Sequence, residues 1–592
     1  YFGLDAHLER FLAQNCRVMS QTQIYCETGP GVGNDLRWSV RLGDPVESPL
    51  VTLSDLSTAS LTSFRPPRIT GLTGSGASAT GTATTGGAQV IISGENFGPG
   101  YITSPKFSLV DYSHANYGPT GDQQRYKIYC TVNSHTKMTC LLEAGVGQGH
   151  KWRVTVGGQN STVFQGLSTR YADPVISQIE VDANAASTLG CSLSDGLCVT
   201  LIGSNFGPAC ESETPFCANA TYGGVDGIKY GPVSCRVKTA HTHLECNTDP
   251  GIGKDLRWKV TREFLVSTLS TATSRYSAPS ITGLLASLGS VSISITGTMA
   301  TVAHANHGTI MVKTGDSVTL SGYESSRAAL SSTFTVVGFP TLTSLRLDVA
   351  STGLSSGDMG AGQAAVNIAG NFKGVPTIGG TVIRIRGTSF GPPGQAQIQA
   401  LYGGQTPLDY TATSCSVTVD TTAYSEATCT TVPGIGQDLV WRITVTEQSS
   451  TLSTVKMRYA PPVLVNVSSE AGPNDSGQTP LGLTQGGTRL TFFGSQFGPS
   501  EHAHASVKYR YQLNLQTVGA FSMASCTVLG HSKIDCVTME GVGQHLMFQV
   551  TVADQQSELD IITGPRGGYA KPNVTSFSLD TVVRSMVTVG GQ

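Results

Sequence analysis

The chain has 592 residues, which is about four to six domains at the usual domain size. Its 37 basic and 40 acidic side chains give a net charge of −3, so it lacks the basic surface that nucleic-acid binding requires. Its 70 glycines follow no three-residue period, which excludes collagen, and the absence of heptads excludes long helical arrays. A hydrophobic content of 39% is enough for packed cores and argues against wholesale disorder.

In chain order, five segments share one motif: a cysteine, a Gly-x-Gly turn and an aromatic residue twelve positions after the cysteine. They are Cys26–Val40, Cys140–Val154, Cys246–Val260, Cys429–Ile443 and Cys536–Val550. The aromatic position holds all four tryptophans of the chain and one phenylalanine: Trp38, Trp152, Trp258, Trp441 and Phe548. Internal repetition of this kind indicates a repeat architecture.

The aromatic residues are expected in the cores of β-sandwiches. In Leu36–Val40 the residues Leu36, Trp38 and Val40 alternate with polar ones, which places them on one face of a strand. The alternative is an exposed platform on which a sugar stacks. We expect the Gly-x-Gly turns to need positive φ angles.

Three further motifs mark the rest of each repeat. A strand that ends in Gly and is followed by Phe-Gly-Pro occurs at Val90–Pro99, Thr200–Pro208, Arg384–Pro392 and Thr491–Pro499. A Tyr-Gly pair, or Tyr-Phe-Gly at the start of the chain, follows at Tyr1, Tyr117, Tyr222 and Tyr402. Proline-led joints open a new strand at Pro66, Pro174, Pro279, Pro461 and Pro572.

The second cysteines of successive repeats are 114, 106, 183 and 107 positions apart, so the third interval holds an insertion. Short strands with period-2 patterns and Gly/Pro turns predict an all-β tandem array of immunoglobulin-like β-sandwiches with local disulfides. The predicted divisions are a partial sandwich at 1–64 without its front strands, sandwiches at 65–172 and 173–277, a small degenerate β module at 278–339, a sandwich with a long leading loop at 340–460, a sandwich at 461–570, and the first strands of a further domain at 571–592.

The 14 cysteines fall into seven close pairs: Cys16 with Cys26, Cys130 with Cys140, Cys191 with Cys198, Cys210 with Cys217, Cys235 with Cys246, Cys415 with Cys429, and Cys526 with Cys536. None has the Cys-x-x-Cys spacing of a zinc site, so local disulfides in an oxidising compartment are expected. For Cys191, Cys198, Cys210 and Cys217 three connectivities remain open.

Glycosylation signals agree with an extracellular location. Asn-x-Ser/Thr sequences occur at Asn160, Asn219, Asn466, Asn474 and Asn573. The low-complexity stretch Thr73–Gly87 is predicted to be a flexible loop or an O-glycosylated one. The uncharged segment Ile281–Ala303 alternates, so it predicts strands and not a membrane span.

Several patterns imitate catalytic or metal sites. Gly387–Gly391 matches Gly-x-Ser-x-Gly, but the sister repeats have Asn96, Asn205 or Gln496 in place of Ser389, and no helix is expected after it. The Gly-x-Gly turns lack the helix of a dinucleotide site. His241 with His243, and His502 with His504, could share a strand face but lack further ligands. The sequence therefore predicts no catalytic residue, metal or cofactor, and a protein that is not an enzyme.

The Gly-x-Asn-Phe-Gly-Pro entry at 94–99, the Cys…Trp exit motif and the proline joints resemble those of IPT/TIG domains, the immunoglobulin-like modules of plexins and fibrocystin-type proteins. The Cys-paired variant resembles tandem arrays of secreted or cell-surface proteins in algae and other protists. The resemblance implies a structural segment of a glycosylated extracellular filament, such as a flagellar hair (mastigoneme) or cell-surface fibre, that self-associates or belongs to a longer chain of repeats. The alternatives are the ectodomain stalk of a receptor or adhesin, or an accessory region of a carbohydrate-active enzyme. Both chain ends fall inside a repeat, as expected for part of a longer chain or for strand exchange between subunits.

Overall fold

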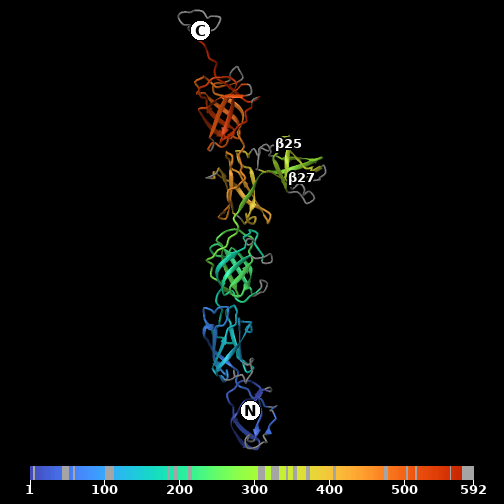
Figure 1. Cartoon of the computed structure of the whole chain (residues 1–592), viewed down its shortest axis with the longest axis vertical. Coiled ribbons are helices and arrows are strands. Elements are labelled where there is room, and N and C mark those ends of the chain that lie inside the picture. The colour runs from blue at the N-terminus through green and yellow to red at the C-terminus, as the bar shows by residue number, and fades with distance from the viewer. Residues whose placement is uncertain are drawn as a thin grey trace. The chain divides into compact units, whose positions relative to one another are not determined.

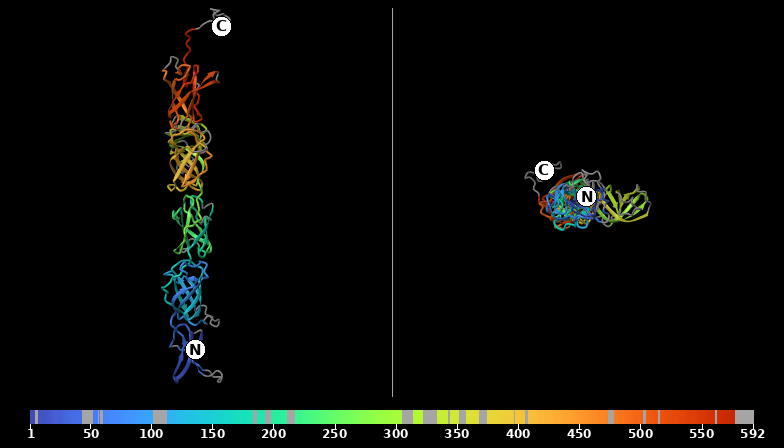
Figure 2. Two further views of the ribbon diagram at one scale, coloured as in Figure 1. Left: turned by 90° about the vertical axis from the view of Figure 1, so that its left-hand side faces the viewer. Right: turned by 90° about the horizontal axis from the view of Figure 1, so that it is seen from below.

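A computed structural model shows strands and connecting loops almost throughout (Figures 1 and 2). It describes residues 1–4, 7–42, 52–55, 57, 60–100, 113–182, 186–192, 198–210, 217–304, 314–321, 333–341, 344–350, 357–367, 374–395, 397–404, 408–472, 478–501, 504–513, 516–560 and 562–576. The chain divides into two compact units, Tyr1–Tyr276 and Ser277–Gln592. Among the described residues the one helix is a short 3-10 turn, η1 (Ser75–Ala77).

The second repeat shows the plan of a complete sandwich. One sheet pairs, in order, β8 (Arg68–Thr73), β9 (Gln89–Glu95), β12 (Lys137–Leu141) and the second half of β11 (Tyr126–Ser134). The first half of β11 continues into the facing sheet, with β10 (Ser113–Gly118), β13 (Lys151–Val156) and β14 (Gln159–Asn160). Buried and half-buried residues alternate along β13, as expected for a strand with one face on the core.

The other repeats of the first unit follow the same plan. In the third repeat, β15 (Val175–Val181), β16 (Val199–Ser204), β19 (His243–Cys246) and β18 (Tyr230–Thr239) lead into β17 (Ala218–Gly223), β20 (Arg257–Arg262) and β21 (Leu265–Val266). The first repeat contains a sheet of β2 (His7–Phe11), β1 (Phe2–Leu4) and β5 (Arg37–Trp38), and the pairs β3 (Gln14–Ser20) with β4 (Gln23–Glu27) and β6 (Arg41–Leu42) with β7 (Thr52–Leu53). The described residues of this repeat contain no counterpart of β8 and β9.

The second unit contains two more sandwiches. In the first of them, one sheet pairs β22 (Ser280–Thr296), β28 (Val382–Thr388), β32 (Ser425–Thr430) and β31 (Thr413–Asp420), in that order. Its second sheet pairs β30 (Tyr410–Thr411), β29 (Ile398–Gly403), β33 (Val440–Val445) and β34 (Gln448–Ser449). In the other sandwich, one sheet pairs β35 (Val463–Ser469), β37 (Arg489–Ser495), β41 (Lys533–Val537) and β40 (Ser525–Gly530). Its second sheet pairs β36 (Thr479–Pro480), β44 (Arg566–Gly568), β42 (Leu546–Val552), β38 (Ala505–Leu513) and β39 (Gln516–Ser522), and β43 (Gln555–Gln556) pairs with β42.

The insertion is a closed β-barrel. The second half of β22 pairs with β23 (Met299–His304), and the ring continues through β26 (Ser344–Asp348), β25 (Thr333–Thr341), β24 (Ser317–Ser321) and β27 (Gly357–Asn367) back to β22. Figure 1 labels β25 and β27 of this barrel. Each described strand of the barrel therefore has two neighbours, so none of these strands presents an open edge for pairing with another chain. Apolar residues such as Val291, Ile293 and Leu345 fill its interior.

This pairing divides the segment 278–460 differently from the prediction. Residues 280–286 pair with 382–388, so the first half of β22 is the front strand of the following sandwich, and the barrel is inserted between β22 and β28. The predicted boundary at 340 lies inside β25. The sequence pattern could not show this because one continuous strand serves two sheets. At the far end of the chain, 577–592 lie outside the described residues, so the predicted strands at 571–592 are described only to 576.

Candidate functional site: the joints between sandwiches

Each sandwich is pinned by a disulfide that directly bridges two paired strands. In β11 and β12 the residue opposite Cys130 is Cys140, and the same holds for Cys235 with Cys246 and Cys526 with Cys536. The seven disulfides join the same pairs that the sequence predicts: Cys16–Cys26, Cys130–Cys140, Cys191–Cys198, Cys210–Cys217, Cys235–Cys246, Cys415–Cys429 and Cys526–Cys536. Chains with this many disulfides belong to oxidising compartments, which places the protein outside the cytosol.

The tryptophans are core residues, as expected. The side chains of Trp152, Trp258 and Trp441 are fully buried, and Trp38 is half-buried against Phe2. In each complete sandwich that carries a tryptophan, its ring stacks on a tyrosine, for example Tyr222 on Trp258 with centroids 4.2 Å apart. Phe548 is buried at the same position in the last sandwich. None of these buried rings can serve as an exposed platform for sugar.

Each complete sandwich also contains a buried pair of tyrosines that the sequence motifs did not predict. The pairs are Tyr117 with Tyr171, Tyr222 with Tyr276, Tyr402 with Tyr459, and Tyr509 with Tyr569. The second tyrosine stands two or three positions before each joint proline, and this spacing was the available signal. Burial raises the pKa of Tyr402 to about 12, so the phenols stay neutral and hydrogen-bonded.

The second turn glycines have the expected positive φ angles, between 97° and 122°: Gly33, Gly147, Gly253, Gly436 and Gly543. The residue between the two turn glycines takes part in the contact with the following sandwich. Ile435 packs against the core of the last sandwich, and a Cβ on Gly207 would lie 2.2 Å from the side chain of Val146. The Gly-x-Gly motif is therefore one half of a joint between successive sandwiches.

A glutamine forms the same hydrogen bond at two joints. Gln159 Nε2 donates to the backbone oxygen of Phe64 in the preceding sandwich, and Gln555 Nε2 donates to that of Tyr459, both at 2.8 Å. Both glutamines occupy the turn after the strand that carries the aromatic motif, in β14 and β43. At the intervening joint of the first unit this position is Leu265, which is buried in the core cluster of the preceding sandwich.

Two joints, one in each unit, share a second contact. Thr84 Oγ1 lies 2.9 Å from His241 Nδ1, and Thr377 Oγ1 lies 2.9 Å from His531 Nδ1. The backbone amide of each threonine also donates to a side-chain oxygen of the next sandwich, Asn205 Oδ1 at 3.5 Å and Gln496 Oε1 at 2.8 Å. We call this arrangement of threonine, Asn or Gln, and histidine the joint clasp.

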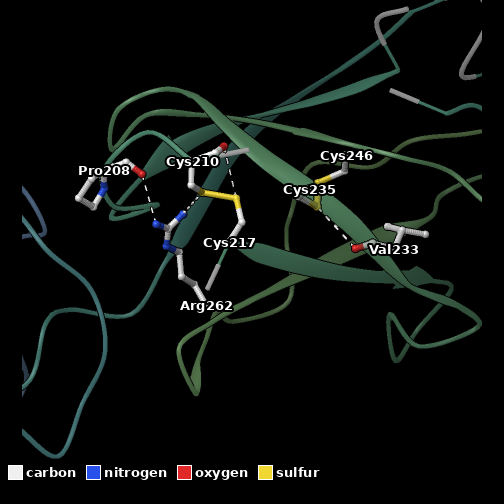
Figure 3. The surroundings of a disulfide bond; sticks show 7 residues. All are labelled: Pro208, Cys210, Cys217, Val233, Cys235, Cys246 and Arg262. Carbon is white, nitrogen blue, oxygen red and sulfur yellow. Dashed lines mark hydrogen bonds between the residues drawn. A yellow bond between two sulfur atoms is a disulfide. The ribbon is translucent and has the colours of Figure 1, made fainter. Parts of the chain in front are cut away.

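Charged groups strengthen the joint between the second and third sandwiches. Arg125 lies 3.0 Å from Glu263 of the next sandwich, and Gln148 donates to the backbone oxygen of Phe264 at 3.0 Å. Arg262 points its guanidinium at Pro208 O and at the disulfide sulfur of Cys210, as Figure 3 shows.

Thr84 is fully buried at the joint between the second and third sandwiches, so the prediction of a flexible or O-glycosylated loop at Thr73–Gly87 is wrong at this residue.

The remaining candidate sites do not assemble into chemistry. Ser389 has a φ of 62°, the same conformation as Asn96, Asn205 and Gln496, in a turn that leads to no described helix. His241 points to Thr84, whereas the Nδ1 atom of His243 lies 2.9 Å from Thr242 Oγ1, so these two imidazoles have different partners. His502 lies outside the described residues, and those described contain no cluster of three metal-binding side chains.

Four of the predicted glycosylation sites are exposed in the structure, namely Asn160, Asn219, Asn466 and Asn573. Asn474 lies outside the described residues. Among the described helices, none combines the length and hydrophobicity required to cross a lipid bilayer.

Comparisons with known proteins return distant structures only. No family model matches the chain, and no curated protein matches it. Among solved structures, the S-layer protein rSbsC(31-844) is 11% identical over 86% of this chain and 54% of its own, with a TM-score of 0.13. The chicken CNTN1 FN1–FN3 domains are 9% identical over 67% of this chain and 99% of theirs, with a TM-score of 0.16. The Escherichia coli adhesin FdeC is 12% identical over 66% and 99%, with a TM-score of 0.16. The fold assignment therefore rests on the strand pairing described above, which defines an array of immunoglobulin-like sandwiches.

Proposed function

We propose that the chain is a structural, non-enzymatic segment of an extracellular filament built from IPT/TIG-type sandwiches, of the mastigoneme or cell-surface fibre type. The observation that carries the proposal is the repeated joint. The glutamine bond occurs at two joints, and so does the contact between threonine and histidine in the clasp. These contacts are the same although the sequences of the repeats around them differ. Flexible linkers between independent domains do not need matched contacts of this kind.

The mechanical argument follows from the disulfides and the joints together. A disulfide across two paired strands limits how far a sandwich can unravel, and packed joints resist bending between repeats. Sugars on Asn160, Asn219, Asn466 and Asn573 would shield the outer faces. The partners under this proposal are further copies of the same repeats, and no cofactor or metal takes part.

The proposal is tested by negative-stain electron microscopy of the native material, without proteolysis or reduction. Filaments with a regular axial repeat are expected. Dispersed single molecules at the native concentration would refute the filament assignment.

The inserted barrel favours a second candidate, the ectodomain stalk of an adhesin or receptor. A closed barrel that interrupts one sandwich, between β22 and β28, adds a separate surface that stacking does not require. Under this candidate the barrel binds a ligand and the sandwiches present it. Replacing 288–367 with a short turn removes the barrel but keeps Thr377 and the clasp. Under this candidate the replacement would abolish attachment to cells or surfaces and leave the remaining sandwiches folded, whereas a filament protein would still assemble.

A further inference from the structure

We propose that the joint clasp is a pH-sensitive lock: with a neutral histidine it holds two consecutive sandwiches together, and protonation of that histidine releases them. The proposal concerns single chains and does not depend on filament assembly. It rests on the geometry shared by the Thr84–His241 and Thr377–His531 joints.

The histidine position follows from the fold. His241 and His531 each stand five residues before the second disulfide cysteine of their sandwich, Cys246 and Cys536, in the hairpin turn between the disulfide-linked strands. The backbone oxygen of each histidine accepts from the phenylalanine amide of the Phe-Gly-Pro motif, Phe206 or Phe497. The turn is thereby fixed, and the imidazole is held toward the preceding sandwich.

Protonation changes what this contact can do. A neutral imidazole with its proton on Nε2 accepts the threonine proton at Nδ1, whereas an imidazolium carries a proton on Nδ1 and can only donate. Thr84 is fully buried and Thr377 is 1% exposed, so a hydroxyl proton displaced from this bond cannot turn to bulk water. The joined state therefore favours the neutral histidine over the charged one.

The surrounding groups act in the same direction. Burial at the joint lowers the pKa of His531, and burial together with the positive charge of Arg262 lowers the pKa of His241. Arg262 faces His241 from β20, and Glu263, the acidic group next to Arg262, is held by Arg125. Because the histidine pKa is lower in the joined state than in free histidine, the joint is stable above the ordinary histidine pKa of about 6.5 and weakens as the pH falls below it.

The joint formed by Thr377 and His531 is the better one to test, because the other contains a second buried histidine, His150. Two exposed positions on either side of it, Gln399 and Lys508, accept spin labels through the substitutions Gln399→Cys and Lys508→Cys. All native cysteines are in disulfides, so the introduced thiols are the only reactive ones. The experiment uses the full chain and measures the distribution of label-to-label distances by pulsed electron paramagnetic resonance at about pH 7.5 and about pH 5.

We expect the distance distribution to broaden reversibly on acidification, while hydrogen exchange of β33 and β42 shows that the cores of both sandwiches stay intact. The variant His531→Gln should remove the pH response, because glutamine does not titrate. His545→Gln is the matched control: it removes a histidine from the same sandwich but not from the clasp, and should leave the response unchanged. If His531→Gln fails to fold, Thr377→Val should give the broad distribution already at the higher pH.

A distribution of equal width at both pH values would overturn the proposal. So would a response that persists in His531→Gln, because it would place the titrating group elsewhere.

Discussion

The hydroxyl oxygens of Tyr222 and Tyr276 lie 2.7 Å apart in the core of the third sandwich, and both rings are buried. Tyr276 also donates to the backbone oxygen of Asp249 at 2.6 Å, and the amide of Asp249 donates to Tyr222 at 2.7 Å. The pair thus connects three segments: β17, which carries Tyr222, the Gly-x-Gly loop, which follows Asp249, and the joint, which follows Tyr276. In the first sandwich the corresponding rings are Phe2 and Phe64, which have no hydroxyl groups.

The substitution Tyr276→Phe is expected to destabilise the third sandwich by about 1–3 kcal/mol, because it removes the donor to the half-buried backbone oxygen of Asp249 and a partner of the buried Tyr222 hydroxyl. Hydrogen exchange of β17 and β20 measures this locally, and the other sandwiches of the chain serve as internal references. The double variant Tyr222→Phe with Tyr276→Phe should cost less than the sum of the single variants, because the two hydroxyls are partners. Unchanged protection of β17 in Tyr276→Phe would contradict the assigned role.

A strand glycine in each complete sandwich meets the carbonyl of the neighbouring strand. A Cβ on Gly203 would lie 1.8 Å from Val175 O, and one on Gly387 would lie 1.8 Å from Ser280 O. The neighbouring strand has an irregular register at this point, between Ile176 and Gln178 in the third sandwich. Such a bulge brings the two backbones too close for any side chain.

We therefore expect Gly203→Ala to cost about 1–3 kcal/mol or to displace β15. Gly224→Ala is the matched control, because a Cβ there would meet nothing within 4 Å. The free energy of unfolding of the two variants is compared by urea denaturation, and hydrogen exchange at the amides of β15 and β16 serves as the readout. Equal stability of the two would mean that the bulge relaxes at no cost.

Much of the fold could be predicted from the sequence, because each repeat carries the same local signals. The cysteine spacing indicates which strands are paired, and alternation around Trp258 indicates which face is buried. The front half of β22 could not be assigned, because pairing between residues 280–286 and 382–388 spans an inserted barrel. The clasp was also hidden, because His241 and Thr84 are 157 positions apart and neither residue type signals a contact between domains.

The disulfide Cys130–Cys140 should contribute about 3 kcal/mol to the stability of its sandwich, by the loop entropy of a ten-residue separation. The double variant Cys130→Ser with Cys140→Ser removes it, and hydrogen exchange of β11 and β12 reports the loss. Peptide mapping without reduction should recover the linked peptides from the native chain. Free thiols at these positions in native material would contradict both the pairing and the extracellular assignment.

The indole nitrogen of Trp152 donates to Thr169 Oγ1 at 2.9 Å inside the core. At the matching position of the fourth sandwich stands Met457, and the indole nitrogen of Trp441 has no hydrogen-bond partner among the described residues. Thr169→Val keeps the side-chain shape but removes the acceptor, so we expect a loss of about 1–3 kcal/mol. Thr131→Val, at an exposed position of the same sandwich, is the control, and thermal unfolding of the two variants compares them. Equal melting temperatures would show that the indole bond adds no stability.

His150 is buried where the other sandwiches have a leucine, namely Leu36, Leu256, Leu439 and Leu546. Burial, together with the positive charge of Arg125, lowers the pKa of His150 from 6.5 to about 4. The unfolded chain therefore binds a proton that the folded sandwich does not bind between these two values. The second sandwich should accordingly lose stability as the pH falls from about 6.5 toward 4, by about 3 kcal/mol in total.

His150→Leu restores the residue found in the other repeats and should remove this acid sensitivity, while His135→Leu, on the hairpin of the same sandwich, should not. Local hydrogen exchange at several pH values, corrected for intrinsic rates, decides between them. An acid response of equal size in His150→Leu would show that another group titrates.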